Sequence, residues 1–176
     1  MHYTTNYTSP VGQLTLASDG DNLTGLWLAG QKYFCAAVDG HAQTENNLSI
    51  FNAAKEWLDG YFAGENPALS KLSLAPAGGD FRREVWKLLR EIPYGTVTTY
   101  GEIAKKIALK MRKKSMSAQA VGGAVGHNPI SIIIPCHRVI GGNGSLTGYA
   151  GGVHIKQKLL ELESAHMTNI FVPLKG

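Results

Sequence analysis

The chain has 176 residues, of which 44% are hydrophobic and 17% charged, and it carries a formal net charge of +4. This length suits one large domain or two small ones with a proper core, and the composition is that of an ordinary globular protein. It excludes a transmembrane chain and a signal-bearing one, because no apolar run reaches membrane-spanning length and the N-terminus lacks the pattern of a signal peptide. Cys35 and Cys136 lie roughly a hundred residues apart. We therefore expect a cytoplasmic protein with no membrane partner and no disulfide framework.

The first 76 residues predict a small β-rich scaffold domain. Strands are expected over residues 3–8, 13–18 and 23–28, separated by turn residues. Apolar residues at helical spacing predict a helix over residues 49–62. The Pro- and Gly-containing stretch 75–79 is the best candidate for a linker, and the charge balance changes there.

Charge is distributed unevenly along the chain. Residues 1–78 contain three Lys or Arg and seven Asp or Glu, whereas residues 79–176 contain fourteen and six. No acidic residue occurs between Ile103 and Leu160. A basic half of this kind favours a polyanionic partner. For this stretch we favour nucleic acid over a solvated lysine-rich loop.

Residues 79–166 predict a mostly helical domain, and residues 167–176 a tail. Asp80 is a plausible N-cap for a helix over 81–91, and Thr99 with Glu102 fits a capping box at the start of the next helix. A basic connection over 110–114 leads to a short helix over 117–126. Two short helices joined by a basic turn indicate a helix-turn-helix, and the alternative is two packed helices of any α/β domain.

The second of these helices contains the adjacent glycines Gly122 and Gly123. Each costs about 1 kcal/mol relative to alanine inside a helix. That cost makes sense where the backbone approaches another surface closely, such as a DNA groove. The predicted fold class is therefore α+β: a small N-terminal three-layer-like α/β domain with an antiparallel sheet, followed by a mostly helical, winged-helix-like DNA-binding domain.

The apolar run over residues 130–134 ends at Pro135, and Cys136 follows. The run predicts a buried strand that stops at the proline, which cannot donate a ladder hydrogen bond. Cys136 would then lie at a strand end with His137 and Arg138 beside it, and neighbouring cations favour the nucleophilic thiolate. The alternative is a buried structural cysteine beside a solvated His-Arg pair.

Motifs over about residues 80–164 occur in the order typical of one family. They are Phe81–Trp86, Tyr94–Ala104, Gly126–Pro129, Pro135–Val139, Thr147–Gly152 and a tail from Lys156 to Glu163. Together they closely resemble the O6-alkylguanine-DNA alkyltransferases, also called methylated-DNA–protein-cysteine methyltransferases. The first 75 residues resemble the variable first domain of that family only in length and strand content.

The resemblance implies DNA repair by a single transfer of an alkyl group from O6 of guanine, with O4 of thymine as a further candidate, to Cys136. The nucleotide would first be flipped out of double-stranded DNA. A Cys–water–His–Glu relay would consist of Cys136, His137 and Glu163. Asn128 would brace the active-site turn, and Tyr100 would help to rotate the nucleotide and donate to the base.

The resemblance also implies which residues hold the base and the duplex. The substrate would be bound by Tyr149, Ala150, Gly151 and Val139. DNA contacts are expected from Thr98, Lys114, Ser117, Gln119, Ala120, Gly122, Gly123 and Arg138. Gln119 departs from the family, which commonly has an arginine that enters the duplex there, and Ala150 stands where some members have serine. The reaction requires no metal or cofactor, and we expect a monomer.

Three other functions remain open at this point. A relative that binds alkylguanine without transferring the group would lack the cysteine. A helix-turn-helix regulator could use Cys136 as a sensor. A cysteine hydrolase could use Cys136 and His137, although it would also need an oxyanion hole.

Overall fold

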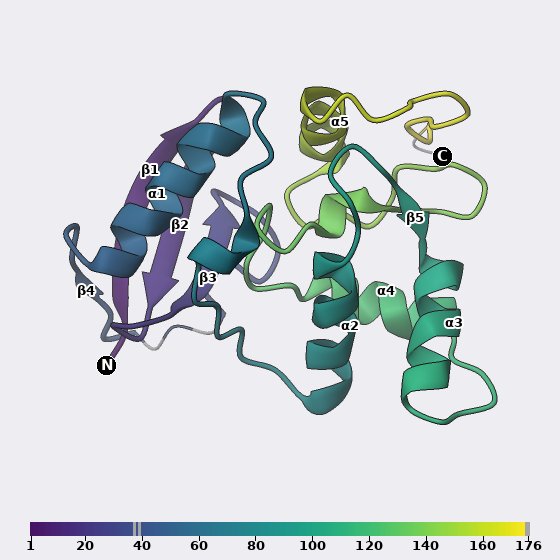
Figure 1. The fold of residues 1–176 in the computed structure, drawn as a ribbon, viewed down its shortest axis with the longest axis horizontal. Helices are drawn as coiled ribbons and strands as arrows, with labels where there is room; N and C mark the ends of the chain where they lie inside the picture. The colour runs from purple at the N-terminus through teal and green to yellow at the C-terminus, as the bar shows by residue number, and fades with distance from the viewer. Residues whose placement is uncertain (37, 39, 175–176) are drawn as a thin grey trace. The chain divides into compact units, whose positions relative to one another are not determined.

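The computed structural model describes residues 1–36, 38 and 40–174, and the chain forms two compact units (Figure 1). The first unit consists of Met1–Ala77 together with Pro129–Ile133. The second consists of Gly78–Asn128 and the chain from Ile134 onward. Among the helices that the structure describes, none has the length and hydrophobicity to cross a membrane.

The first unit is built on a four-stranded sheet with strand order β3-β2-β1-β4. Its elements are β1 (Tyr3–Ser9), β2 (Gly12–Ser18), β3 (Leu23–Leu28), β4 (Gln43–Thr44), α1 (Ser49–Phe62) and the 3-10 turn η1 (Leu69–Lys71). Strand β2 pairs antiparallel with β1 and β3, and β4 pairs parallel with β1. Helix α1 packs on the sheet and buries Phe51, Ala54 and Leu58. The strands and the helix expected here are confirmed to within one residue.

The apolar segment 130–134 belongs to a buried turn, so the strand prediction is wrong. Ile130 makes a single parallel bridge to Leu26, and the Ser131 amide donates to the Leu26 carbonyl. Residues 131–133 then turn, with Ile132 at a φ of +69°. β-branched composition reports burial, which this segment has, but its pairing with described strands ends after that one bridge.

The second unit is mainly helical. Its elements are α2 (Asp80–Arg90), β5 (Thr98–Thr99), α3 (Tyr100–Lys110), α4 (Ala118–Gly126), the 3-10 turn η2 (Cys136–Arg138), β6 (Val139–Ile140) and α5 (Val153–Leu162). Helix α4 packs against both α2 and α3 (Figure 1). The buried Trp86 indole donates to the Ala124 carbonyl at 2.9 Å, which joins α2 to α4.

Side-chain caps begin two of these helices. The Thr99 hydroxyl accepts from the Glu102 amide, and the Ser117 hydroxyl accepts from the Ala120 amide. The Glu102 carboxylate pairs with Lys105 at 2.8 Å. The prediction for α2 is off by one position, because Gly79 is the N-cap and Asp80 is the first helical residue.

The described chain after α5 packs back onto the second unit. The Leu146 amide donates to the Phe171 carbonyl at 2.8 Å, and the Phe171 amide donates to the Gly144 carbonyl at 3.0 Å. Met167 and Ile170 pack on a small apolar cluster formed by Ile140, Leu146, Leu160 and Ala165. Residues 167–174 are therefore part of this unit, where the sequence had indicated a separate tail.

Candidate active site

The candidate nucleophile lies on a tight turn beside the start of α3. Cys136 opens η2, and its amide donates to the Ile134 carbonyl at 2.8 Å. Strands β5 and β6 pair in parallel, with Thr98 opposite Val139 and Thr99 opposite Ile140. This two-residue ladder holds the N-terminus of α3 next to the end of the cysteine turn.

Cys136 is buried, with 6% of its surface exposed. Burial raises the pKa of its thiol, while a hydrogen bond from the Asn128 side chain and the charge of Lys156 act in the opposite direction. Asn128 is also buried, and its Nδ2 donates to the Ile134 carbonyl at 2.8 Å. One amide side chain thus contacts both the turn and its sulfur. The resting form is the thiol, so a nearby base has to take its proton before sulfur can attack.

His137 and Glu163 form a buried pair, with 2.7 Å between Nε2 and Oε1. Burial by itself would raise the pKa of Glu163, but hydrogen bonds from His137 and Arg138 lower it to about 2. Burial lowers the pKa of His137, which is therefore neutral at pH 7. A neutral imidazole that donates from Nε2 to a carboxylate has its lone pair on Nδ1, and this nitrogen can act as a base.

Arg138 does not lie where the sequence predicted. It is buried, its Nε and Nη2 each donate to Glu163 at 2.9 Å, and its Nη1 donates to the Ile92 carbonyl at 2.7 Å. A guanidinium committed to these partners is not positioned for phosphate, so its assignment as a DNA contact is corrected. The solvated His-Arg pair of the structural-cysteine alternative is also wrong, because both side chains are buried.

Tyr100 and Lys156 converge on one backbone carbonyl. The Tyr100 hydroxyl donates to the Thr147 carbonyl at 3.0 Å, and burial raises the pKa of this hydroxyl to about 12. The Lys156 ammonium donates to the carbonyls of Thr147 at 2.8 Å and Val139 at 2.5 Å. Burial lowers the pKa of Lys156 to about 8. The segments that carry Val139 and Thr147 are thereby held together.

Sequence reasoning missed Lys156 as a site residue, although a signal was present. Residues 156, 159, 160 and 163 recur at helical spacing and share one face of α5. Leu159, Leu160 and Glu163 on that face are buried, and Lys156 is fully buried with them. A lysine on the apolar face of a short helix, one turn or two from a predicted relay glutamate, is the pattern that indicates a functional cation.

The expected pocket residues lie around the cysteine to different depths. The Tyr149 hydroxyl is buried without a hydrogen-bond partner among the described residues. Burial raises its pKa, and the nearby Cys136 raises it further. Ala150 and Gly151, which follow it, are half-buried. An unsatisfied hydroxyl close to the sulfur is a donor available to a bound base.

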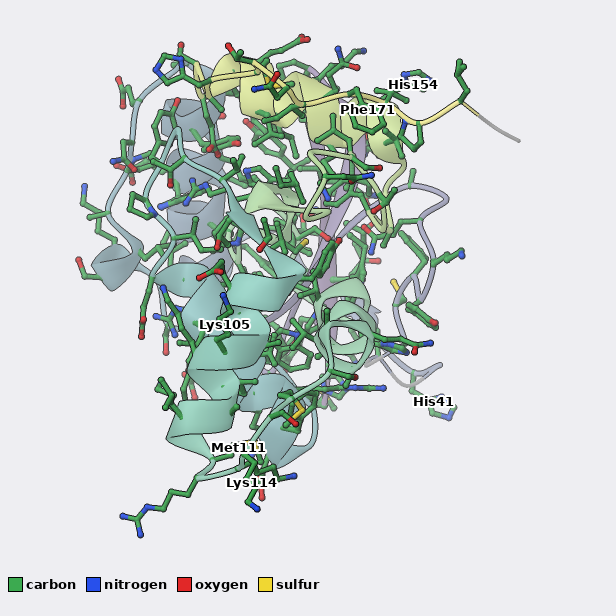
Figure 2. All side chains as sticks on the ribbon, turned by 90° about the vertical axis from the view of Figure 1, so that its right-hand side faces the viewer. His41, Lys105, Met111, Lys114, His154 and Phe171 are labelled. Carbon is green, nitrogen blue, oxygen red and sulfur yellow. The ribbon has the colours of Figure 1, made fainter. Side chains whose placement is uncertain are left out.

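The expected DNA surface is the exposed side of α4 and its approach. Ser117, Gln119, Ala120 and Gly123 are exposed, whereas Gly122 and Thr98 are half-buried. A Cβ built on Gly123 would meet no atom within 4 Å, so packing inside the protein does not require glycine there. Lys114 is exposed on the basic turn after α3, near Met111 (Figure 2). Over the described residues, no group of three or more His, Cys, Asp or Glu could hold a metal ion.

Comparisons with known proteins agree with this geometry. Residues 80–165 match the family described as 6-O-methylguanine DNA methyltransferase, DNA binding domain, and residues 1–76 match its ribonuclease-like domain. A methylated-DNA–protein-cysteine methyltransferase of Haemophilus influenzae is 42% identical over 92% of this chain and 86% of its own. One of Mycobacterium tuberculosis is 45% identical over 94% and 93%.

Solved structures give the same result. The structure of Mycobacterium tuberculosis O6-methylguanine methyltransferase matches with a TM-score of 0.78 at 42% identity, covering 99% of this chain and 97% of that one. A structure of Mycobacterium tuberculosis OGT in complex with DNA also matches with a TM-score of 0.78 at 42% identity, covering 96% and 97%. The chain belongs to the 6-O-methylguanine DNA methyltransferase family.

Proposed function

We propose that this protein repairs DNA by moving an alkyl group, typically methyl, from O6 of guanine to the sulfur of Cys136, once per molecule. The observation that carries the proposal is the buried Cys136 on a turn that continues directly into the His137–Glu163 pair. Relatives named methylated-DNA–protein-cysteine methyltransferase, at 42% and 45% identity, support the same reaction.

In the proposed reaction, the Cys136 thiol gives its proton to Nδ1 of His137 through a water molecule. Sulfur then attacks the alkyl carbon, a carbon–sulfur bond forms, and the carbon–oxygen bond breaks with its electron pair going to guanine. Glu163 stabilises the imidazolium that results. The Tyr100 hydroxyl is the proposed donor to the departing base. The thioether has no route back to thiol, so each molecule acts once.

Access to O6 requires the nucleotide to leave the stack, at a cost of a few kcal/mol. We propose that the exposed small residues of α4 approach the duplex and that Gln119 hydrogen-bonds the base left behind. Lys114 and Ser117 would contact phosphate, and Tyr149 with Ala150, Gly151 and Val139 would hold the flipped base. Every proposed residue comes from one chain, so a monomer suffices. A cytoplasmic location fits two cysteines that are not bonded to each other.

The test is the intact mass of the protein after mixing with a duplex that contains one O6-methylguanine. We expect a stoichiometric gain of one methyl group, mapped to Cys136 by peptide analysis. Cys136→Ala should show no gain while its affinity for the duplex stays nearly unchanged, and Cys35→Ala is the matched control that keeps full transfer. Lesion-dependent binding without a mass gain would instead indicate a recognition protein, and transfer that survives in Cys136→Ala would overturn the proposal.

A further inference from the structure

The Glu163 carboxylate is shared by two basic side chains of the same turn. Its Oε1 accepts from His137 at 2.7 Å and from Arg138 at 2.9 Å, while Oε2 accepts from Arg138 at 2.9 Å and from the Gly95 amide at 3.1 Å. A buried carboxylate needs a compensating positive charge. Either His137 or Arg138 could supply it, and which one does decides the protonation state of the histidine.

Arg138 is held in place on all sides. Its remaining donor group, Nη1, bonds the Ile92 carbonyl, and its guanidinium lies 5.7 Å from the centre of the Tyr94 ring. A guanidinium keeps its proton at any pH relevant to a protein. The charge that balances Glu163 is therefore permanent and is fixed by geometry.

We propose that Arg138 is a positioning residue that balances the charge of Glu163 and so keeps His137 neutral, with Nδ1 able to accept the proton of Cys136. Without Arg138, the cation nearest to Glu163 would be an imidazolium. An imidazolium carries a proton on Nδ1 and cannot take another. The inference rests on the transfer reaction proposed above and adds to it the residue that sets its base.

Other charged groups around His137 stay constant when Arg138 is changed. Lys156 on α5 faces the histidine and lowers the pKa of the imidazole, as Arg138 does, whereas Glu163 raises it. Cys136 precedes His137 on η2, and Tyr94 faces both Arg138 and Glu163. A change in the titration of His137 on substitution of Arg138 thus reports the loss of that one charge.

The first measurement is the NMR titration of the His137 ring in the full chain without DNA, assigned by comparison with His137→Gln. In Arg138→Met we expect the midpoint to rise by at least about one pH unit, because a buried carboxylate left without its arginine favours the imidazolium. Arg138→Lys retains the charge and should leave the midpoint close to that of the wild type. The exposed His154 is the internal control and should not move.

The second measurement is the pH dependence of the single-turnover transfer rate. In Arg138→Met the acid limb should move to higher pH with the NMR midpoint, so that the rate is about tenfold lower near neutral pH and recovers in alkali. Arg138→Lys should keep the wild-type limb with a lower plateau. A purely structural role predicts an equal loss at every pH and an unmoved midpoint, and that result would overturn the inference.

A third variant covers the case in which Arg138→Met does not fold. Arg138→Met combined with Glu163→Gln removes both buried charges and leaves neither unpaired. Its His137 midpoint should not rise above that of the wild type, and a rise would also overturn the inference. Because the NMR titration requires no DNA, failure of methyl transfer would count against the proposed function and leave this test standing.

Discussion

The charged residues of the site owe their properties to partners that lie far from them in the sequence. Glu163 is nearly anhydrous, yet four hydrogen bonds from His137, Arg138 and Gly95 stabilise its ionised form. Lys156 is equally buried, but its partners are neutral carbonyls, and burial lowers its pKa to about 8. The same burial therefore favours the charged form of one residue and the neutral form of the other.

The low pKa of Glu163 predicts how folding stability depends on pH. Its pKa is about 2 in the folded protein and near the ordinary 4.5 when unfolded, so the stabilisation is complete above pH 4.5 and is lost as the pH falls toward 2. Its size is about 3 kcal/mol, an order-of-magnitude value. Denaturant unfolding of Glu163→Gln at several pH values should show lower stability at pH 7 and a gap to wild type that narrows in acid.

The matched control for this prediction is Glu161→Gln, which changes an exposed carboxylate one residue from the end of α5. Its stability difference from wild type should be small at every pH. A gap for Glu163→Gln that stays constant down to pH 3 would show that the hydrogen bonds to this carboxylate do not control its ionisation.

At the scale of elements, periodic patterns predicted the helices and strands well because each records its own burial. The helix over 49–62 and the strand over 23–28 have the predicted bounds. The segment over 130–134 shows the limit of this reasoning. Its composition is that of a strand, but pairing depends on a neighbour elsewhere in the chain, and Ile132 instead takes a left-handed conformation.

The loop that carries Gly148 predicts a second effect on transfer. Gly148 has a φ of +73°, and a Cβ there would lie 2.8 Å from the Tyr100 hydroxyl. Gly148→Ala should cost about 1–2 kcal/mol in backbone strain and displace the tyrosine from the Thr147 carbonyl. We expect a lower single-turnover rate together with a lower melting temperature.

Gly142→Ala is the control for this loop, since a Cβ there meets nothing within 4 Å and its φ is not positive. It should retain the transfer rate and stability of the wild type. Equal rates for the two alanine variants would show that the close approach of Gly148 to Tyr100 has no part in the reaction.

On the scale of the whole molecule, the division of charge predicts how DNA binding depends on salt. Residues 1–78 have a net charge of −4 and residues 79–176 of +8, from three basic against seven acidic and fourteen against six. Affinity for an undamaged duplex should fall steeply as salt rises, because phosphate contacts release counterions. Lys114→Ala should lower affinity and reduce the slope of log affinity against log salt by about one.

Fluorescence anisotropy over a range of salt concentrations measures this slope. Lys71→Ala, which removes an exposed lysine of the acidic half, is the matched control and should leave the slope unchanged. Binding that does not respond to salt would contradict the electrostatic account of the basic half.

The sequence by itself determined the two-part organisation, most helices and strands, the family and the residues Cys136, His137 and Glu163. These follow from local periodicity and from motifs that are contiguous or nearly so. Only the tertiary structure decided that Arg138 pairs with Glu163, that Lys156 is buried between two carbonyls, and that residues 167–174 pack on the second unit. The physical reason is that burial and charge compensation depend on which distant groups meet, and the spacing of residues along one chain does not contain that information.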